Sequence, residues 1–242
     1  MSQKTKVYAH RGFSSKFPEN TMRAFEEARK RNVSGIELDV QLTKDGEVVV
    51  IHDEEINRTT NGIGYVQDFF LKQIILFDAG TWFHKAFHQE AIPTLRDVFE
   101  WIVSTKSLLT LNIELKNDVI AYEGLEENVL ELIEEYELGN QVIISSFNYK
   151  SLMKVRDIHP HISLGFLFEG IDNKAVEKAL NIQASGLHCE AEYAFSAEAK
   201  RAKAAGLELR VYTVNDKHLF LQLMNEGVDV IMTDDLEINK RM

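Results

Sequence analysis

The sequence lacks several features that would mark a specialised class of protein. It has a single cysteine, Cys189, so an internal disulfide framework is excluded and a reducing compartment is favoured. No apolar run of signal-peptide length follows Met1, and no run reaches the roughly 18–20 residues that a membrane span requires. We therefore expect a cytoplasmic protein with no stable membrane association.

Positive charge is also in deficit. The chain has 27 lysines and arginines against 38 aspartates and glutamates, and its formal net charge is −11. Such a chain repels the backbone of nucleic acids and anionic membrane surfaces, so neither is expected as the main partner. An anionic small molecule would have to be held by local cations or by a metal ion, because the overall field opposes its approach.

Prolines and glycines are few, at three and thirteen, and no linker, low-complexity tract or tandem repeat divides the 242 residues. We predict a single domain over residues 1–242. Short β-branched runs alternate with amphipathic helical stretches, which is typical of βα units around a parallel sheet. The predicted strands are Val7–His10, Gly35–Val40, Val48–His52, Leu109–Leu115, Val142–Ser145, Ile162–Leu167, Gly186–Glu190, Leu209–Val214 and Val228–Thr233. The predicted helices are Thr21–Arg31, Leu95–Thr105, a helix with Leu125, Val129, Leu132 and Tyr136 on one face, Tyr149–His159, Lys174–Leu180, Ala197–Ala205, Lys217–Glu226 and Leu236–Arg241.

Nine strands are predicted, one more than an eight-stranded barrel needs, and the third is the extra one. Only residues 42–47 separate it from the second, and Asp45-Gly46 is a strong two-residue hairpin turn. A parallel crossover needs a dozen or more residues, so this pair must be antiparallel and the third run extends strand two. The remaining eight strands predict a (β/α)₈ TIM barrel of the α/β class. Residues 54–92 are too long for a βα loop, and we predict a small insertion after strand two that covers the barrel mouth.

Polar side chains gather at the predicted C-terminal ends of the strands, where the active sites of such barrels form. Residues two apart share one side of a strand, which groups Glu37 with Asp39, and Glu114 with Lys116. The first strand ends in His10 and Arg11. With a two-residue turn at Asp45-Gly46, the hairpin register pairs Asp39 with His52, which places this histidine beside the carboxylates.

Carboxylates from neighbouring strands repel one another in a cleft unless they are protonated or bind a cation. An all-oxygen ligand set without cysteine favours one hard divalent ion, Mg²⁺ or Ca²⁺. The alternative is that Glu37 and Asp39 form ordinary ion pairs with Arg11 and Lys116. His10 and His52 fit general acid–base work, and Arg11 and Lys116 fit the neutralisation of a phosphate, so the set favours phosphodiester cleavage.

The chain resembles the glycerophosphodiester phosphodiesterases of the bacterial, cytoplasmic type, through motifs that run from residue 10 to residue 229. They are His10-Arg11-Gly12, Pro18-Glu19-Asn20-Thr21, Glu37-Leu38-Asp39-Val40, Thr43-Lys44-Asp45-Gly46, His52-Asp53, Arg58-Thr59-Thr60-Asn61-Gly62, Ile92-Pro93-Thr94-Leu95, Ile113-Glu114-Leu115-Lys116, Thr213-Val214-Asn215 and Gly227-Val228-Asp229. The resemblance implies hydrolysis of glycerophosphodiesters such as glycerophosphocholine or glycerophosphoethanolamine to glycerol 3-phosphate and an alcohol.

The resemblance also implies roles for single residues. It implies that Glu37, Asp39 and Glu114 bind the metal ion. It also implies that His10 and His52 act as general acid and base, and that Arg11 and Lys116 contact the phosphate. Glu19 either joins a ligand or holds Arg11 in place, or else it belongs to the first turn of the next helix. Tyr212 stands where many members of the family have tryptophan, so an aromatic wall is kept and the preference for the alcohol is expected to differ. Phe147 is expected to line the same pocket.

Several other residues carry more than one interpretation. His188 either contacts the substrate or is a hydrogen-bonded histidine of the barrel, and Cys189 is expected to be a small buried residue. Asp234 could bind glycerol hydroxyls, but we expect it to cap the final short helix.

Two other functions compete with the small soluble diester. A lysophospholipase D-like lipid phosphodiesterase would need an apolar mouth or a membrane-docking surface, and a non-catalytic binding barrel would have lost a ligand or a histidine. The sequence shows neither feature.

Overall fold

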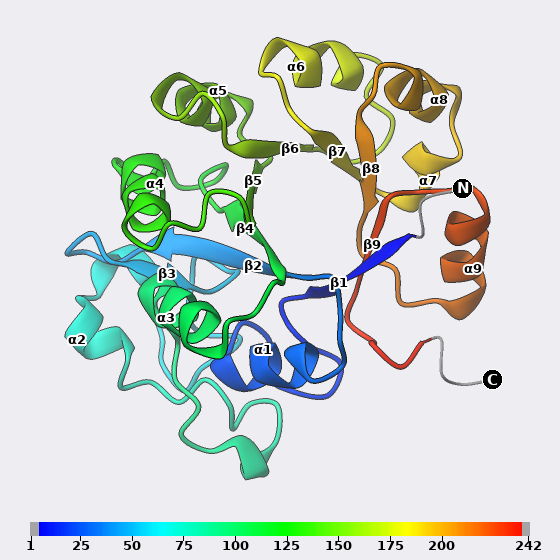
Figure 1. Cartoon of the computed structure of the whole chain (residues 1–242). Helices are drawn as coiled ribbons and strands as arrows, with labels where there is room; N and C mark the ends of the chain where they lie inside the picture. Colours follow the sequence, from blue (N-terminus) through cyan, green and yellow to red (C-terminus); the bar gives the residue numbers. More distant parts are fainter. Residues whose placement is uncertain (1–4, 239–242) are drawn as a thin grey trace.

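The computed structural model describes residues 5–238 and confirms the predicted barrel (Figure 1). Its strands are β1 (Lys6–His10), β2 (Gly35–Leu42), β3 (Val48–Val50), β4 (Thr110–Leu115), β5 (Val142–Ser146), β6 (Ser163–Leu167), β7 (Gly186–Cys189), β8 (Glu208–Val211) and β9 (Val230–Thr233). All except β3 are parallel, and β1 pairs with both β9 and β2, so the sheet closes on itself. The β3 strand pairs antiparallel with β2 outside this ring, as the short connection predicts.

Helices surround the ring on its outside (Figure 1). The longer ones are α1 (Met22–Arg29), α3 (Leu95–Thr105), α4 (Leu125–Glu135), α5 (Tyr149–Ile158), α6 (Ala175–Asn181), α8 (Ala197–Ala204) and α9 (Lys217–Asn225). Side-chain caps fix where several begin: Thr21 caps α1, and Thr94 with Asp97 forms a capping box on α3. Of the predicted final helix Leu236–Arg241, residues 236–238 form a turn and the remainder lies outside the described residues.

The core has two layers. Most apolar side chains lie between the strands and the helices, where α3 buries Leu95, Val98, Phe99 and Ile102 on one face. A smaller apolar cluster fills the inside of the barrel, formed by Tyr8, Ile143, Val230 and Met232. Side chains therefore close the barrel floor, and functional groups are left to the carboxyl ends of the strands.

The hairpin between β2 and β3 turns through three residues, not two. The amide of Thr43 donates to the carbonyl of Glu47, and Gly46 takes the left-handed conformation with φ of +83° that such a loop requires. The register pairs Val40 with Val50, and the amide of Ile51 donates to the carbonyl of Asp39. The predicted pairing of Asp39 with His52 is therefore wrong by one residue.

Residues 54–92, predicted as an insertion after strand two, lie between β3 and α3. They contain α2 (Leu71–Ile74) and the short 3₁₀ turns η1 (Val66–Asp68) and η2 (Lys85–Phe87), none of which was predicted. The segment lies to one side of the barrel, next to β3 and α3, and not across the barrel mouth as predicted (Figure 1). It has an apolar cluster that includes Ile56, Val66, Ile74 and Ile92.

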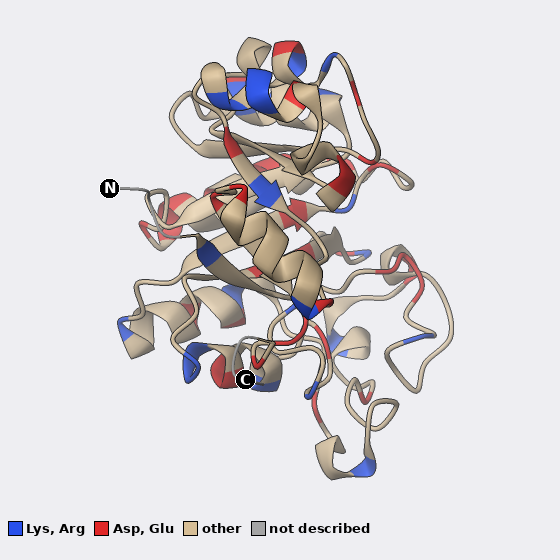
Figure 2. Cartoon of the chain, turned by 90° about the vertical axis from the view of Figure 1, so that its right-hand side faces the viewer, with Lys and Arg blue, Asp and Glu red and all other residues tan. Residues whose placement is uncertain are grey.

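Charged residues are scattered over the outer helices and loops, with both signs mixed along the same elements (Figure 2). Within residues 5–238, no helix combines the length and the apolar character needed to cross a membrane.

Candidate active site

Three carboxylates meet at the carboxyl ends of β2 and β4. Glu37 and Asp39 lie two apart on β2, and the parallel register places Glu114 of β4 directly beside Asp39. One oxygen of each carboxylate lies within 4.8 Å of the others, and Glu37 and Asp39 are almost fully buried. The alternation of side chains along a strand and the register between strands therefore bring together the predicted ligand set.

The electrostatics of the cluster suit a cation. Burial, reinforced by the charges of Asp39 and Glu114, raises the pKa of Glu37 well above its usual value, and burial beside Asp39 raises the pKa of Glu114. Burial also opposes ionisation of Asp39, but Arg11, His52 and Lys116 together lower its pKa. Oε1 of Glu37 is buried and has no hydrogen-bond partner among the described residues. A divalent ion would neutralise the repulsion and give this oxygen a partner.

Arg11 approaches the cluster from the loop after β1. Its left-handed backbone, with φ of 55°, directs its amide to Oε2 of Glu37 at 3.0 Å. Its guanidinium lies 3.3 Å from Asp39 and donates to Glu19 at 2.9 Å. The alternative of simple ion pairs is only partly met. Arg11 lies against Asp39 and Lys116 pairs with Glu114, but in the described chain no lysine or arginine lies within 4 Å of Glu37, which has only His10 at 3.9 Å.

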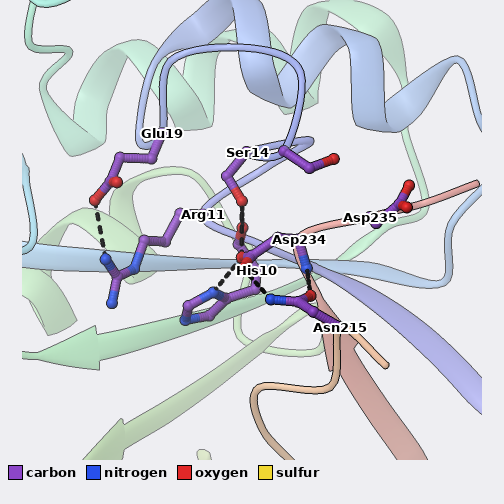
Figure 3. Close-up of a pocket in the computed structure, with 8 residues that line it drawn as sticks. His10, Arg11, Ser14, Glu19, Asn215, Asp234 and Asp235 are labelled. Carbon is purple, nitrogen blue, oxygen red and sulfur yellow. Dashed lines mark hydrogen bonds and ion pairs between the residues drawn. The ribbon is translucent and has the colours of Figure 1, made fainter. Parts of the chain in front are cut away.

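His10 is held by a carboxylate on the far side of its ring. Nδ1 lies 2.7 Å from Oδ1 of Asp234, and Asp234 also accepts hydrogen bonds from Ser14 and Asn215 (Figure 3). These bonds outweigh burial and lower the pKa of Asp234 to about 2. Nε2 of His10 is left facing Glu37 at 3.9 Å and the hydroxyl of Thr213 at 3.5 Å.

This geometry corrects the expectation for Asp234. Its side chain does not cap the turn that follows, because its oxygens are occupied by His10, Ser14 and Asn215. The neighbouring Asp235 accepts the amide of Glu237 instead, and its side chain points away from His10 (Figure 3).

His52 has the same arrangement on the opposite side of the cluster. Nδ1 lies 2.6 Å from Oδ1 of Asp53, and Nε2 lies 3.4 Å from the ammonium group of Lys116. Lys116 in turn donates to Glu114 at 2.9 Å. Since an ionised carboxylate can only accept, Nδ1 of each histidine carries a hydrogen, and Nε2 is the atom that faces the reaction space.

Glu19 lies before α1, where Thr21 is the N-cap, so the alternative that places it in the first helical turn is wrong. Its carboxylate accepts from Arg11 and from Arg58 of the insertion. These bonds keep the pKa of Glu19 below its usual value although burial opposes them.

The remaining predicted residues form a wall beside Lys116. The rings of Phe147 and Tyr212 meet edge to face at 6.4 Å, and Lys116 lies 5.8 Å from the centre of the Phe147 ring. The hydroxyl of Tyr212 donates to the carbonyl of Phe168 at 2.9 Å, which fixes the orientation of the ring. The wall therefore presents an aromatic surface next to a cation.

A cavity of about 370 Å³ opens at the His10 side of this centre. It is lined by His10, Arg11, Ser14, Ser15, Glu19, Asn215, Asp234 and Asp235 (Figure 3). The volume suits a small polar molecule, and the lining offers both donors and acceptors.

His188 takes no part in this centre. It is fully buried inside the barrel, with Nε2 3.0 Å from Nη1 of Arg210, which supports the barrel-histidine alternative. Cys189 is buried, as predicted.

Sequence reasoning missed the residues that hold the histidines. Asp53 follows His52 directly, so its position was a usable signal. Asp234 and Asn215 lie far along the chain from His10, and no local pattern indicates that they hold it. Arg58 lies only five positions from Asp53, but its bonds to Glu19 cross 39 positions.

Two histidines, each with a carboxylate on Nδ1, flank three carboxylates, two of them almost fully buried, with Arg11 and Lys116 beside them. Such a centre can transfer protons on both sides of a phosphodiester whose charge it neutralises. The model of the glycerophosphoryl diester phosphodiesterase family matches residues 10–238. The chain belongs to this family.

Known proteins agree with this assignment over nearly the whole chain. A glycerophosphodiester phosphodiesterase from Caldanaerobacter subterraneus subsp. tengcongensis is 44% identical over 234 residues, which cover 97% of this chain and 96% of that one. Another, from Bacillus altitudinis, is 40% identical over 232 residues, covering 95% of this chain and 94% of the relative. The chain is an enzyme of the phosphoric diester hydrolase class.

Solved structures give the same result. The phosphodiesterase OLEI02445 from Oleispira antarctica, solved in complex with the product sn-glycerol-3-phosphate, aligns with a TM-score of 0.89. It is 32% identical, and the match covers 98% of this chain and 96% of that one. A glycerophosphodiester phosphodiesterase from Agrobacterium tumefaciens aligns with a TM-score of 0.84 at 27% identity, covering 97% and 98% of the two chains.

Proposed function

We propose that the protein hydrolyses glycerophosphodiesters such as glycerophosphocholine and glycerophosphoethanolamine to glycerol 3-phosphate and an alcohol. The observation that carries the proposal is the placement of His10 and His52, each anchored through Nδ1, on either side of Glu37, Asp39 and Glu114. The product complex of the Oleispira antarctica relative supports glycerol 3-phosphate as the phosphate-bearing product.

Glu37, Asp39 and Glu114 would hold one divalent ion. Their oxygens form a hard donor set without nitrogen or sulfur, which fits Mg²⁺ or Ca²⁺. When bound, the ion supplies positive charge to the phosphoryl oxygens of the substrate.

The substrate phosphate would lie against Arg11 and Lys116, which already point at the carboxylate cluster. They offset the negative charge of the phosphate in the ground state and the charge that develops as the ester bond breaks. Glu19 keeps the Arg11 guanidinium in place, and Phe147 with Tyr212 forms the surface that the departing alcohol meets.

Proton transfer falls to Nε2 of the two histidines. One accepts a proton from the attacking hydroxyl, which belongs either to water or to the glycerol moiety as its 2-hydroxyl. In the second case the attack forms a cyclic phosphate, and water must then open this ring to give glycerol 3-phosphate. The other histidine donates a proton to the oxygen of the alcohol as its bond to phosphorus breaks. Asp234 and Asp53 orient the rings and stabilise the imidazolium that each ring forms when it is protonated.

The deciding experiment measures glycerol 3-phosphate release from glycerophosphocholine and glycerophosphoethanolamine, first with EDTA and then with Mg²⁺ or Ca²⁺ restored. We expect release that disappears with the chelator and returns with metal. Full turnover after thorough chelation would exclude the metal, and no release from folded, metal-loaded protein would direct attention to lysolipid diesters.

The histidines are tested in the same assay. His10→Ala and His52→Ala are each expected to lower kcat by at least about 10²-fold, the usual scale of acid–base catalysis. A rate near that of the wild type in either variant would remove that histidine from the mechanism.

A further inference from the structure

Arg58 of the insertion joins two carboxylates that belong to different parts of the site. Its guanidinium donates to Asp53 at 2.6 and 3.0 Å and to Glu19 at 2.9 and 2.8 Å. Asp53 accepts from Nδ1 of His52, and Glu19 accepts from the Arg11 guanidinium. One side chain therefore ends two hydrogen-bonded chains that lead outward from the centre, one through His52 and one through Arg11.

We propose that Arg58 is a positioning residue for the hydrolysis described above. Through Asp53 it sets the orientation of the His52 imidazole, and through Glu19 it sets the guanidinium of Arg11. The inference rests on the proposed function, and it adds a residue to which no part of that mechanism assigns a role.

The chemistry of arginine explains why this position needs it. Four hydrogen bonds reach two carboxylates at once, which requires the planar fork of donors that a guanidinium provides. A lysine ammonium carries the same charge but only three donors on a compact group, so it cannot reproduce two bidentate contacts.

The bonds also hold together loops that are distant in sequence. Glu19 lies in the loop after β1, and Arg58 lies 39 positions later in the insertion. Hydrogen bonds from His52 and, to a smaller extent, from Arg58 keep the pKa of Asp53 well below its usual range. Asp53 therefore stays ionised and accepts the hydrogen bond from Nδ1 of His52. If Arg58 is removed, two carboxylates lose their shared cation, and both become free to rotate away from His52 and Arg11.

An arginine that only stabilised the insertion would make the same contacts. The test must therefore measure the orientation of His52 directly. The two Nδ1–H groups bonded to Asp53 and Asp234 should each give a downfield imidazole proton signal in NMR spectra of the metal-free protein. His52→Ala and His10→Ala identify which signal belongs to which ring. In Arg58→Ala we expect the His52 signal to disappear or move and the His10 signal to remain.

Kinetics with glycerophosphocholine provide the second readout. We expect Arg58→Ala to lower kcat/KM by about 10- to 100-fold, the scale on which misplaced groups affect catalysis. The loss should appear in kcat through His52 and in KM through Arg11. The matched control is Arg96→Ala. The Arg96 side chain is 44% exposed, against 43% for Arg58, and it also donates hydrogen bonds to a carboxylate, that of Glu135, away from the site. Arg96→Ala should leave kcat/KM unchanged.

A double-mutant cycle shows whether Arg58 acts through its partners. If it does, Arg58→Ala adds little to the loss of kcat already caused by Asp53→Asn, and little to the rise of KM caused by Glu19→Gln. If Arg58→Ala fails to fold, Arg58→Lys keeps the charge and takes its place in the cycle, with a smaller loss of kcat/KM.

The outcomes separate the two proposals. A wild-type protein with no activity on any glycerophosphodiester overturns the proposed function. An active wild type whose Arg58 variants keep the His52 signal and full kcat/KM, or lose activity additively with Asp53→Asn, overturns the role of Arg58.

Discussion

Nδ1 of His10 lies 2.7 Å from Oδ1 of Asp234, although the two residues are 224 positions apart in the chain. The contact exists because β1 and β9 are neighbours where the barrel closes. It gives His10 the same kind of partner that His52 finds in the adjacent Asp53.

The Asp234 contact predicts that Asp234→Asn lowers kcat by about 10²-fold, because an amide neither holds the ring in one tautomer nor stabilises an imidazolium. The measurement is steady-state turnover of glycerophosphocholine, with thermal unfolding to confirm the fold. In a His10→Ala background the same substitution should have almost no further effect, and a full additional loss would show that Asp234 acts on something other than His10.

The buried carboxylates predict an effect of metal on stability. Mg²⁺ or Ca²⁺ should raise the Tm, because the ion binds the folded site and relieves the repulsion among Glu37, Asp39 and Glu114. Glu37→Gln should raise the Tm of the metal-free protein, by about 2–4 °C for each kcal/mol gained, and abolish the metal-induced increase. Differential scanning calorimetry with and without metal measures both effects, and an unchanged metal response in Glu37→Gln would contradict the assigned ligand.

His188 predicts a specific dependence of stability on pH. Burial, together with a smaller effect of the Arg210 charge, holds the pKa of His188 well below its usual value. The folded protein therefore keeps this ring neutral. The unfolded chain binds a proton below about pH 6.5, and the free energy of unfolding then falls by up to about 1.4 kcal/mol per pH unit.

Urea unfolding at pH 7.5, 6.5 and 5.5 measures that slope. His188→Gln should lose stability at neutral pH but show a shallower fall on acidification, whereas the exposed His161→Gln should behave like the wild type. Equal slopes in all three proteins would contradict a neutral buried His188.

Tyr212 predicts a change in substrate preference without loss of activity. Tyr212→Phe removes the hydrogen bond to the carbonyl of Phe168 and frees a ring that packs on Phe147. We expect the ratio of kcat/KM for glycerophosphocholine and glycerophosphoethanolamine to shift by less than about tenfold, the scale of one hydrogen bond. An identical ratio in the wild type, Tyr212→Phe and Tyr212→Trp would place the alcohol elsewhere.

Much of the fold could be predicted because each βα unit carries its own signals. Strand runs, capped amphipathic helices and the short hairpin connection are local patterns, and the barrel follows from their order. The turn between β2 and β3 was harder to predict, because Asp45-Gly46 is compatible with a loop of two or of three residues. A two-residue loop would pair Asp39 with His52, whereas the observed three-residue loop shifts the register by one residue and places Ile51 beside Asp39.

The sequence by itself determined the eight parallel strands, the insertion and the meeting of Glu37, Asp39 and Glu114, because strand alternation and neighbouring strands are sufficient to bring those carboxylates together. The tertiary structure alone decided that Asp234 serves His10 and that Arg58 ties Asp53 to Glu19. The first contact joins loops at opposite ends of the chain, and the second joins the insertion to the loop after β1. Their partners depend on barrel closure and on the path of the insertion, which no local pattern of residues encodes.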